Sequence, residues 1–201
     1  YGSSAILRQL PNGRRILLAG QKSGVLYGLD PDNKGEILWQ KRLSPGGVLG
    51  GIEWGFTADD KNVYVPISDV WETRSMPGHA GGIYALNFED GSEVWNTPAA
   101  KPDCLDRPGC NAGQPAAATL IPGVLFSGSM DGHMRAYDPV NGKVIWDIDT
   151  KRDYPTVNQV KASGGSIKGA GVTVVDGWVY FGSGYGLWGL PGNVFLAFGP
   201  K

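Results

Sequence analysis

The sequence predicts an all-β fold built from repeated four-stranded units, and three observations support this prediction. A short pattern that ends in Trp recurs along the chain. Apolar, strand-sized stretches precede each copy, and no long segment shows helical periodicity. The 201 residues include 32 glycines, so the chain turns often. Four-stranded units that repeat at about 50 residues are typical of a β-propeller.

The recurring pattern reads YGLDPDNKGEILW, ALNFEDGSEVW and AYDPVNGKVIW, with its final Trp at Trp39, Trp95 and Trp146. Successive copies are 56 and 51 residues apart, and a fourth begins at Ala197. We expect the small first residue to make room for the indole ring. The Asp and Gly shape the turn between the third and fourth strands, and the indole packs between neighbouring blades.

The first two strands of each unit come before this pattern. The first strands are predicted in SSAILRQL, GIEWGFTA, PAAATLI and GAGVTVV, and the second in RRILLAG, NVYVPIS, GVLFSGS and GWVYFGS. The sequence therefore predicts one partial propeller over 1–201. Its blades lie at approximately 1–43, 51–98, 115–150 and 168–201, and the last blade lacks its outer strand.

The connections between strands differ in length between the two faces of the predicted propeller. The long ones are 69–81, 98–114, 150–167 and 184–193, and all fall on one face, which we expect to carry the function. Cys104 and Cys110 lie in one of them and predict a local disulfide, with free thiols or a metal site as alternatives. A disulfide implies an oxidising compartment, here the periplasm.

Charge and hydropathy exclude some partners. The net charge is −1, so no basic surface for nucleic acid is expected. The longest apolar runs have the length of strands, and we expect no membrane span.

The motif A-x-D-x-x-x-G-K-x-x-W at 136–146 resembles the tryptophan-docking motif of dehydrogenases that depend on pyrroloquinoline quinone (PQQ). The same spacing occurs at 85–95, with Asn87 in place of the Asp. This family consists of eight-bladed propellers, and the resemblance covers essentially the whole chain, as the C-terminal half of such a ring. GGSIKGAG and SGYG with PGNV resemble the polyvinyl-alcohol dehydrogenase-like branch.

The resemblance implies four cofactor-binding residues: Lys22, Glu53, Trp54 and Trp188. Each also has a plainer interpretation. Lys22 can be a surface lysine, Trp54 a core residue of an innermost strand, and Trp188 an aromatic lid. Glu53 stands where the family has an amide, so either a nearby cation such as Lys22 is needed beside it, or this position faces away from the cofactor.

The function implied by the resemblance is alcohol oxidation by hydride transfer to PQQ, beside a Ca²⁺ ion, with electrons passed to a cytochrome c. The family's catalytic Asp and most of its Ca²⁺ ligands belong to preceding blades, so no catalytic or metal residue is assigned in this chain. The implied partner is the remaining half of the propeller or a second copy of the chain. The alternative is a non-enzymatic binding module, such as a scaffold of outer-membrane assembly.

Overall fold

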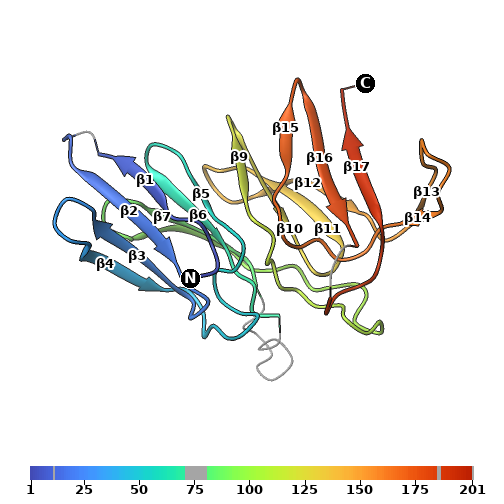
Figure 1. Ribbon diagram of the computed structural model, residues 1–201, viewed down its shortest axis with the longest axis horizontal. Helices are drawn as coiled ribbons and strands as arrows, with labels where there is room; N and C mark the ends of the chain where they lie inside the picture. Colours follow the sequence, from blue (N-terminus) through green and yellow to red (C-terminus); the bar gives the residue numbers. More distant parts are fainter. Residues whose placement is uncertain (11, 71–80, 185–186, 201) are drawn as a thin grey trace.

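The computed structural model describes all residues except 11, 71–80, 185–186 and 201. The described residues form strands and turns, with no helix among them and therefore no helical membrane span. Four antiparallel sheets follow one another in chain order along an arc (Figure 1). We call these sheets blades 1 to 4. This arrangement confirms the predicted all-β, partial-propeller fold.

Within each blade, the strands lie side by side in chain order. Blade 1 contains β1 (Ile6–Gln9), β2 (Arg15–Gly20), β3 (Val25–Asp30) and β4 (Glu36–Arg42). Blade 2 contains β5 (Thr57–Ala58), β6 (Asn62–Pro66), β7 (Ile83–Asn87) and β8 (Glu93–Thr97). Blade 3 contains β9 (Thr119–Ile121), β10 (Val124–Gly128), β11 (His133–Tyr137) and β12 (Val144–Asp149). Blade 4 contains β15 (Thr173–Val175), β16 (Trp178–Ser183) and β17 (Val194–Phe198).

A small hairpin was not anticipated from the sequence. It consists of β13 (Asp153–Tyr154) and β14 (Ala162–Ser163), and it lies in the connection between blades 3 and 4. The guanidinium of Arg152 lies over the Tyr154 ring, 5.1 Å from its centre. This contact gives the hairpin an internal cation–π interaction.

The tryptophans of the repeated motif occupy the same place in blades 1 to 3. Each lies on the outer strand, opposite a small residue of the neighbouring strand: Trp39 opposite Gly28, Trp95 opposite Ala85, and Trp146 opposite Ala136. The pairing register shifts by one residue immediately before each tryptophan. Such a β-bulge increases the local twist of a strand, and its recurrence makes it part of the repeat.

The indole rings join neighbouring blades, as the sequence predicts. A Cβ atom on Gly91 of blade 2 would lie 2.6 Å from the Trp39 ring, and one on Gly142 of blade 3 would lie 2.6 Å from the Trp95 ring. Only glycine leaves room for the indole at these two positions. The indole N–H groups also donate to backbone carbonyls of the next blade: Trp39 to Phe88 at 3.2 Å, and Trp95 to Pro139 at 2.9 Å.

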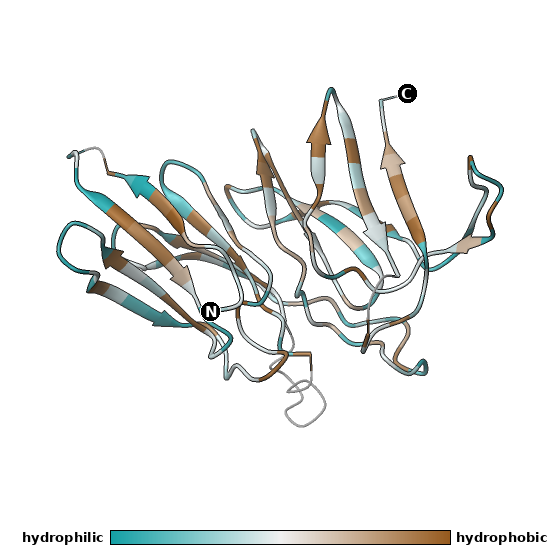
Figure 2. Cartoon of the chain, viewed as in Figure 1, coloured by the Kyte–Doolittle hydropathy of each residue, from teal (hydrophilic) through white to brown (hydrophobic). Residues whose placement is uncertain are grey.

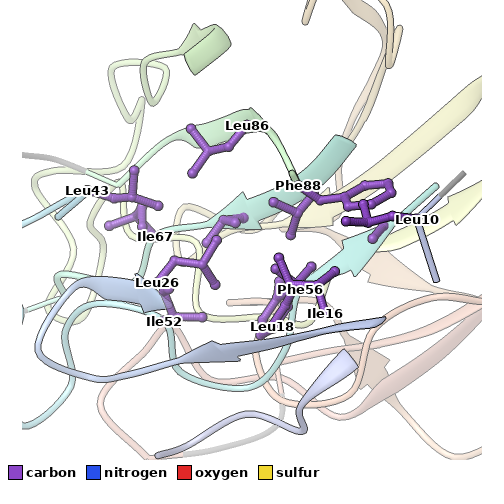
Figure 3. Close-up of a cluster of buried hydrophobic side chains, with 13 residues drawn as sticks. Leu10, Ile16, Leu18, Leu26, Leu43, Ile52, Phe56, Ile67, Leu86 and Phe88 are labelled. Atoms are coloured by element: carbon purple, nitrogen blue, oxygen red, sulfur yellow. The ribbon is translucent and has the colours of Figure 1, made fainter. Parts of the chain in front are cut away.

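The hydrophobic core lies between the blades. The cluster shared by blades 1 and 2 includes Leu18 and Leu26 from one side and Leu86 and Phe88 from the other (Figure 3). A second cluster joins blades 3 and 4, where the Trp146 ring packs edge-on against Phe198. A smaller cluster joins blades 2 and 3: Tyr64, Ile83, Ala85, Ala118, Leu125 and Tyr137. In Figure 2, β17 is coloured mainly as hydrophobic, whereas β16 alternates between hydrophobic and near-neutral residues.

Candidate functional site

The long connections gather at one end of the blades. In an antiparallel sheet, successive turns alternate between the two ends, so the connections β2–β3, β4–β5, β6–β7, β8–β9, β12–β15 and β16–β17 share an end. The opposite end carries only short turns, such as residues 122–123 and 176–177. Residues 71–80, within one long connection, lie outside the described residues.

Lys22 and Glu53, two of the predicted site residues, form an ion pair at this end. Lys22 belongs to the β2–β3 turn, and its Nζ lies 3.4 Å from Glu53 Oε1. The same ammonium donates to the Val48 carbonyl at 2.9 Å. The Ser68 hydroxyl donates to the other carboxylate oxygen of Glu53 at 2.9 Å. The Glu53 side chain is 11% exposed, so it has the nearby cation that its charge requires.

Trp54 does not lie in an innermost strand, so that part of the sequence prediction is wrong. It precedes β5, and 53% of the residue is exposed. The following residue, Gly55, uses its carbonyl to accept a hydrogen bond from Ala118 of blade 3, at 3.4 Å. The strand starts only at Thr57, and the indole of Trp54 is open to solvent.

The Trp54 indole lines a hollow of about 700 Å³ together with Lys168, Tyr180 and Phe195. The Lys168 ammonium donates to the carbonyl of Leu187, the residue before Trp188. Lys168 thus connects the hollow with the β16–β17 connection. The hollow is mainly apolar, with an ammonium group at one side, which suits a planar anion.

Trp188 lies in the β16–β17 connection, is 59% exposed and has a φ of 71°. A left-handed conformation is uncommon for a bulky residue and costs on the order of 1–3 kcal/mol, so surrounding contacts must hold it. Such strain is found disproportionately at functional sites.

Sequence reasoning missed Lys168, although the repeat contains a signal for it. Ile52 and Ile167 occupy equivalent places, since each covers a glycine at the end of a second strand, Gly20 or Gly128. The residue after each isoleucine is ionisable: Glu53 in one case and Lys168 in the other. Aligning the repeats on these isoleucines would therefore have brought Lys168 to the same end as Glu53.

A second polar cluster at this end contains groups that could ligate a metal ion. Asp103, His133 and Asp149 offer ligand atoms within 4.8 Å of one another. However, the Lys151 ammonium lies 3.0 Å from Asp103 and 2.9 Å from Asp149. This hydrogen bond from Lys151 holds the pKa of the Asp103 carboxyl below its usual range. The ammonium already supplies the positive charge, so the cluster is an ion-pair network and not a calcium site.

Cys104 and Cys110 form a disulfide, as predicted, and the free-thiol and metal alternatives are wrong. The bond closes a short loop in the β8–β9 connection. It therefore belongs to the same end of the molecule as Lys22, Trp54 and Trp188.

Repeated antiparallel sheets joined by indole contacts, with the long connections at one end, define a β-propeller of the tryptophan-docked class. Residues 21–163 match the PQQ_2 family model, described as outer membrane protein assembly factor BamB, and the chain belongs to this family.

Among its relatives, the chain is 45% identical over 208 residues to the polyvinylalcohol dehydrogenase of a Pseudomonas species. It is 42% identical over 211 residues to that of Sphingopyxis sp. (strain 113P3). Each alignment covers 98% of the chain but 32% of the relative, so the chain spans about a third of their length. These similarities confirm that the chain resembles a segment of a PQQ-dependent dehydrogenase propeller.

A solved structure shows the same fold. The crystal structure of BamB from Moraxella catarrhalis superposes with a TM-score of 0.59 at 20% sequence identity. The match covers 91% of this chain and 47% of the BamB chain. At this level of identity, the similarity establishes the architecture only.

Proposed function

We propose that this chain forms one wall of the cofactor site of a PQQ-dependent alcohol dehydrogenase. One observation carries the proposal: two ammonium groups, of Lys22 and Lys168, and two exposed indoles, of Trp54 and Trp188, lie at the loop end of the blades, and Trp54 and Lys168 line the same hollow. This donor set fits a planar, aromatic, anionic molecule, because indole faces stack on flat rings and ammonium groups pair with carboxylates. The dehydrogenase names of the relatives support the same reading.

Each residue would have a distinct role. The Trp54 indole would stack on the quinone from the side of the hollow. Lys168 and Lys22 would pair with its carboxylates or ring oxygens. Glu53 and the Val48 carbonyl hold the Lys22 ammonium in place from behind. When bound, PQQ would supply the acceptor for the hydride that leaves the alcohol.

The rest of the reaction centre is assigned to residues outside this chain. We propose that the proton-accepting Asp and the Ca²⁺ ligands come from other blades, and that a cytochrome c receives the electrons. The disulfide supports a periplasmic location, because such bonds persist in oxidising compartments.

Binding of PQQ to the purified chain tests the proposal directly. We expect saturable quenching of tryptophan fluorescence by PQQ, and at least tenfold weaker binding for Trp54→Ala and for Lys22→Gln. The matched control is Lys34→Gln, which removes a lysine from the β3–β4 turn at the opposite end. The proposal fails if PQQ does not bind, or if Lys22→Gln and Lys34→Gln have the same affinity.

The alternative is a non-enzymatic scaffold of the outer-membrane assembly type. It is supported by the description of the matching family and by the shared fold. Absence of PQQ binding, combined with specific binding of a peptide from another protein, would favour this alternative.

We further propose that other blades pack against both ends of the arc, from the remaining part of a longer propeller or from a second copy of the chain. In blade 1, Gly35 corresponds to Gly91 and Gly142, yet a Cβ atom on it would meet nothing within 4 Å. In blade 4, Trp178 and Phe195 are 42% and 72% exposed. Light scattering after size-exclusion chromatography tests self-association, and a monomer at all concentrations would exclude the second copy.

A further inference from the structure

The disulfide loop packs against the connection that carries Trp188, although the two are far apart in sequence. Cys104, Cys110 and Leu190 form a buried cluster of their own, with exposed fractions of 3%, 8% and 1%. Leu190 lies two residues after Trp188. The disulfide thus covers the side chain that anchors this connection.

The two backbones also touch. Gly109 has a φ of 91°, and a Cβ atom on it would lie 2.7 Å from the carbonyl carbon and oxygen of Gly189. A Cβ atom on Gly189 would in turn lie 2.6 Å from Ser166 Oγ and 2.9 Å from Met130 Cε. The residue next to Trp188 is therefore enclosed between the disulfide loop and the connections of blades 3 and 4.

Hydrogen bonds fix the other side of the Trp188 connection. The Leu190 N–H donates to Ser166 Oγ at 2.7 Å, and the Ser166 hydroxyl donates to the Met130 carbonyl at 2.6 Å. The Ser166 N–H donates back to the Leu190 carbonyl at 3.0 Å. These bonds fix the backbone of Leu190 to Ser166, while the disulfide loop packs against its side chain.

The disulfide loop is itself attached to blade 3. Asp103, the residue before Cys104, forms an ion pair with the Lys151 ammonium, whose side chain is 6% exposed. Cys104 Sγ lies 3.7 Å from the Asp131 carbonyl oxygen. The loop is therefore fixed to blade 3 on one side and packs against the β16–β17 connection, which contains Trp188, on the other.

We propose that the Cys104–Cys110 loop is a positioning element for Trp188. Trp188 holds a φ of 71°, which an unconstrained tryptophan would leave. The covalent ring keeps Gly109 against Gly189 and so removes the space into which the backbone could relax. The purpose of this positioning, presenting the indole to a quinone, rests on the proposed function, but the packing between the loops does not.

Hydrogen exchange in the full chain tests the coupling. In the Cys104→Ser/Cys110→Ser variant, we expect the amides of residues 187–190 and of Gly192 to exchange at least tenfold faster, while those of β10 keep their protection. Gly109→Ala should do the same with the disulfide intact, because its Cβ would displace Gly189. The matched control is Gly123→Ala, which has a similar φ of 79° but nothing within 4 Å of the added atom.

A second readout follows Trp188 itself. The acrylamide-accessible fluorescence of Trp188, obtained as the difference from a Trp188→Phe chain, should change in both variants and not in the control. Unchanged exchange and unchanged accessibility in the disulfide variant would overturn the proposal. Faster exchange without any PQQ binding to the unmodified chain would leave the loop coupling standing and reject the quinone site instead.

Discussion

Removal of the Trp95 indole tests the idea that single aromatic rings hold neighbouring blades together. The ring lies between blades 2 and 3, 5.9 Å from the Tyr64 ring and above Gly142. Its N–H donates to the Pro139 carbonyl at 2.9 Å. Trp95→Ala would remove the ring contacts and this hydrogen bond together.

The size of the effect follows from the area that the half-buried ring hides. Tryptophan side chains bury about 150–250 Å², and about 120 Å² for a half-buried one gives about 3 kcal/mol at ~25 cal/mol per Å². The lost hydrogen bond adds about 1 kcal/mol. We therefore expect Trp95→Ala to lower the free energy of unfolding by about 4 kcal/mol, and Trp95→Phe by about 1–2 kcal/mol.

Urea unfolding followed by far-UV circular dichroism measures this change without relying on tryptophan emission. For a slope of about 2 kcal/mol per M, Trp95→Ala should lower the midpoint by about 2 M. The matched control is Trp54→Ala, which removes the same side chain from a position that is 53% exposed and should cost clearly less than Trp95→Ala. Equal losses for Trp95→Ala and Trp54→Ala would refute the reasoning.

Two further predictions concern a glycine and a carboxylate. Gly142→Ala, whose Cβ would meet the Trp95 ring, should destabilise the chain by about 2–3 kcal/mol in urea, against about 1 kcal/mol for Gly123→Ala, where only the backbone is strained. An equal loss for both would exclude the indole contact as the cause. The pKa of Asp103 is lowered in the folded chain by its hydrogen bond from Lys151, so its contribution is present above the unfolded pKa of about 4 and is lost as the pH falls through the folded value. The difference in unfolding free energy between the unmodified chain and Asp103→Asn should thus shrink as the pH falls from 6 to 2.5. A difference that stays constant would contradict a stabilising role of the Asp103 carboxylate.

The repeat made the architecture predictable, because strand alternation, turn residues and the spacing of tryptophans are local features of the sequence. The packing of Trp39 and Trp95 between neighbouring blades was predicted for the same reason. The bulge before each tryptophan was not, since a register shift depends on how two strands twist against each other. The β13–β14 hairpin was not predicted, because its paired strands are too short to show an alternation of polar and apolar residues.

The site was predictable only in part. The pairing of Lys22 with Glu53 was predicted, because a carboxylate in that place needs a nearby cation. The exposure of Trp54 was not predicted, because the start of β5 depends on how the chain packs against other blades and has no local signal in the sequence. The packing of Gly109 on Gly189 joins residues 80 positions apart, and a single sequence has no local signal for such a contact.

The distribution of the core between blades has a consequence for cooperativity. In the described residues, each of the three larger clusters joins adjacent blades, and the cluster between blades 2 and 3 is smaller than those on either side of it. In an array of this kind, stability is close to a sum of nearest-neighbour terms. Blades 1 and 2 can then melt separately from blades 3 and 4 once the boundary between blades 2 and 3 is weakened.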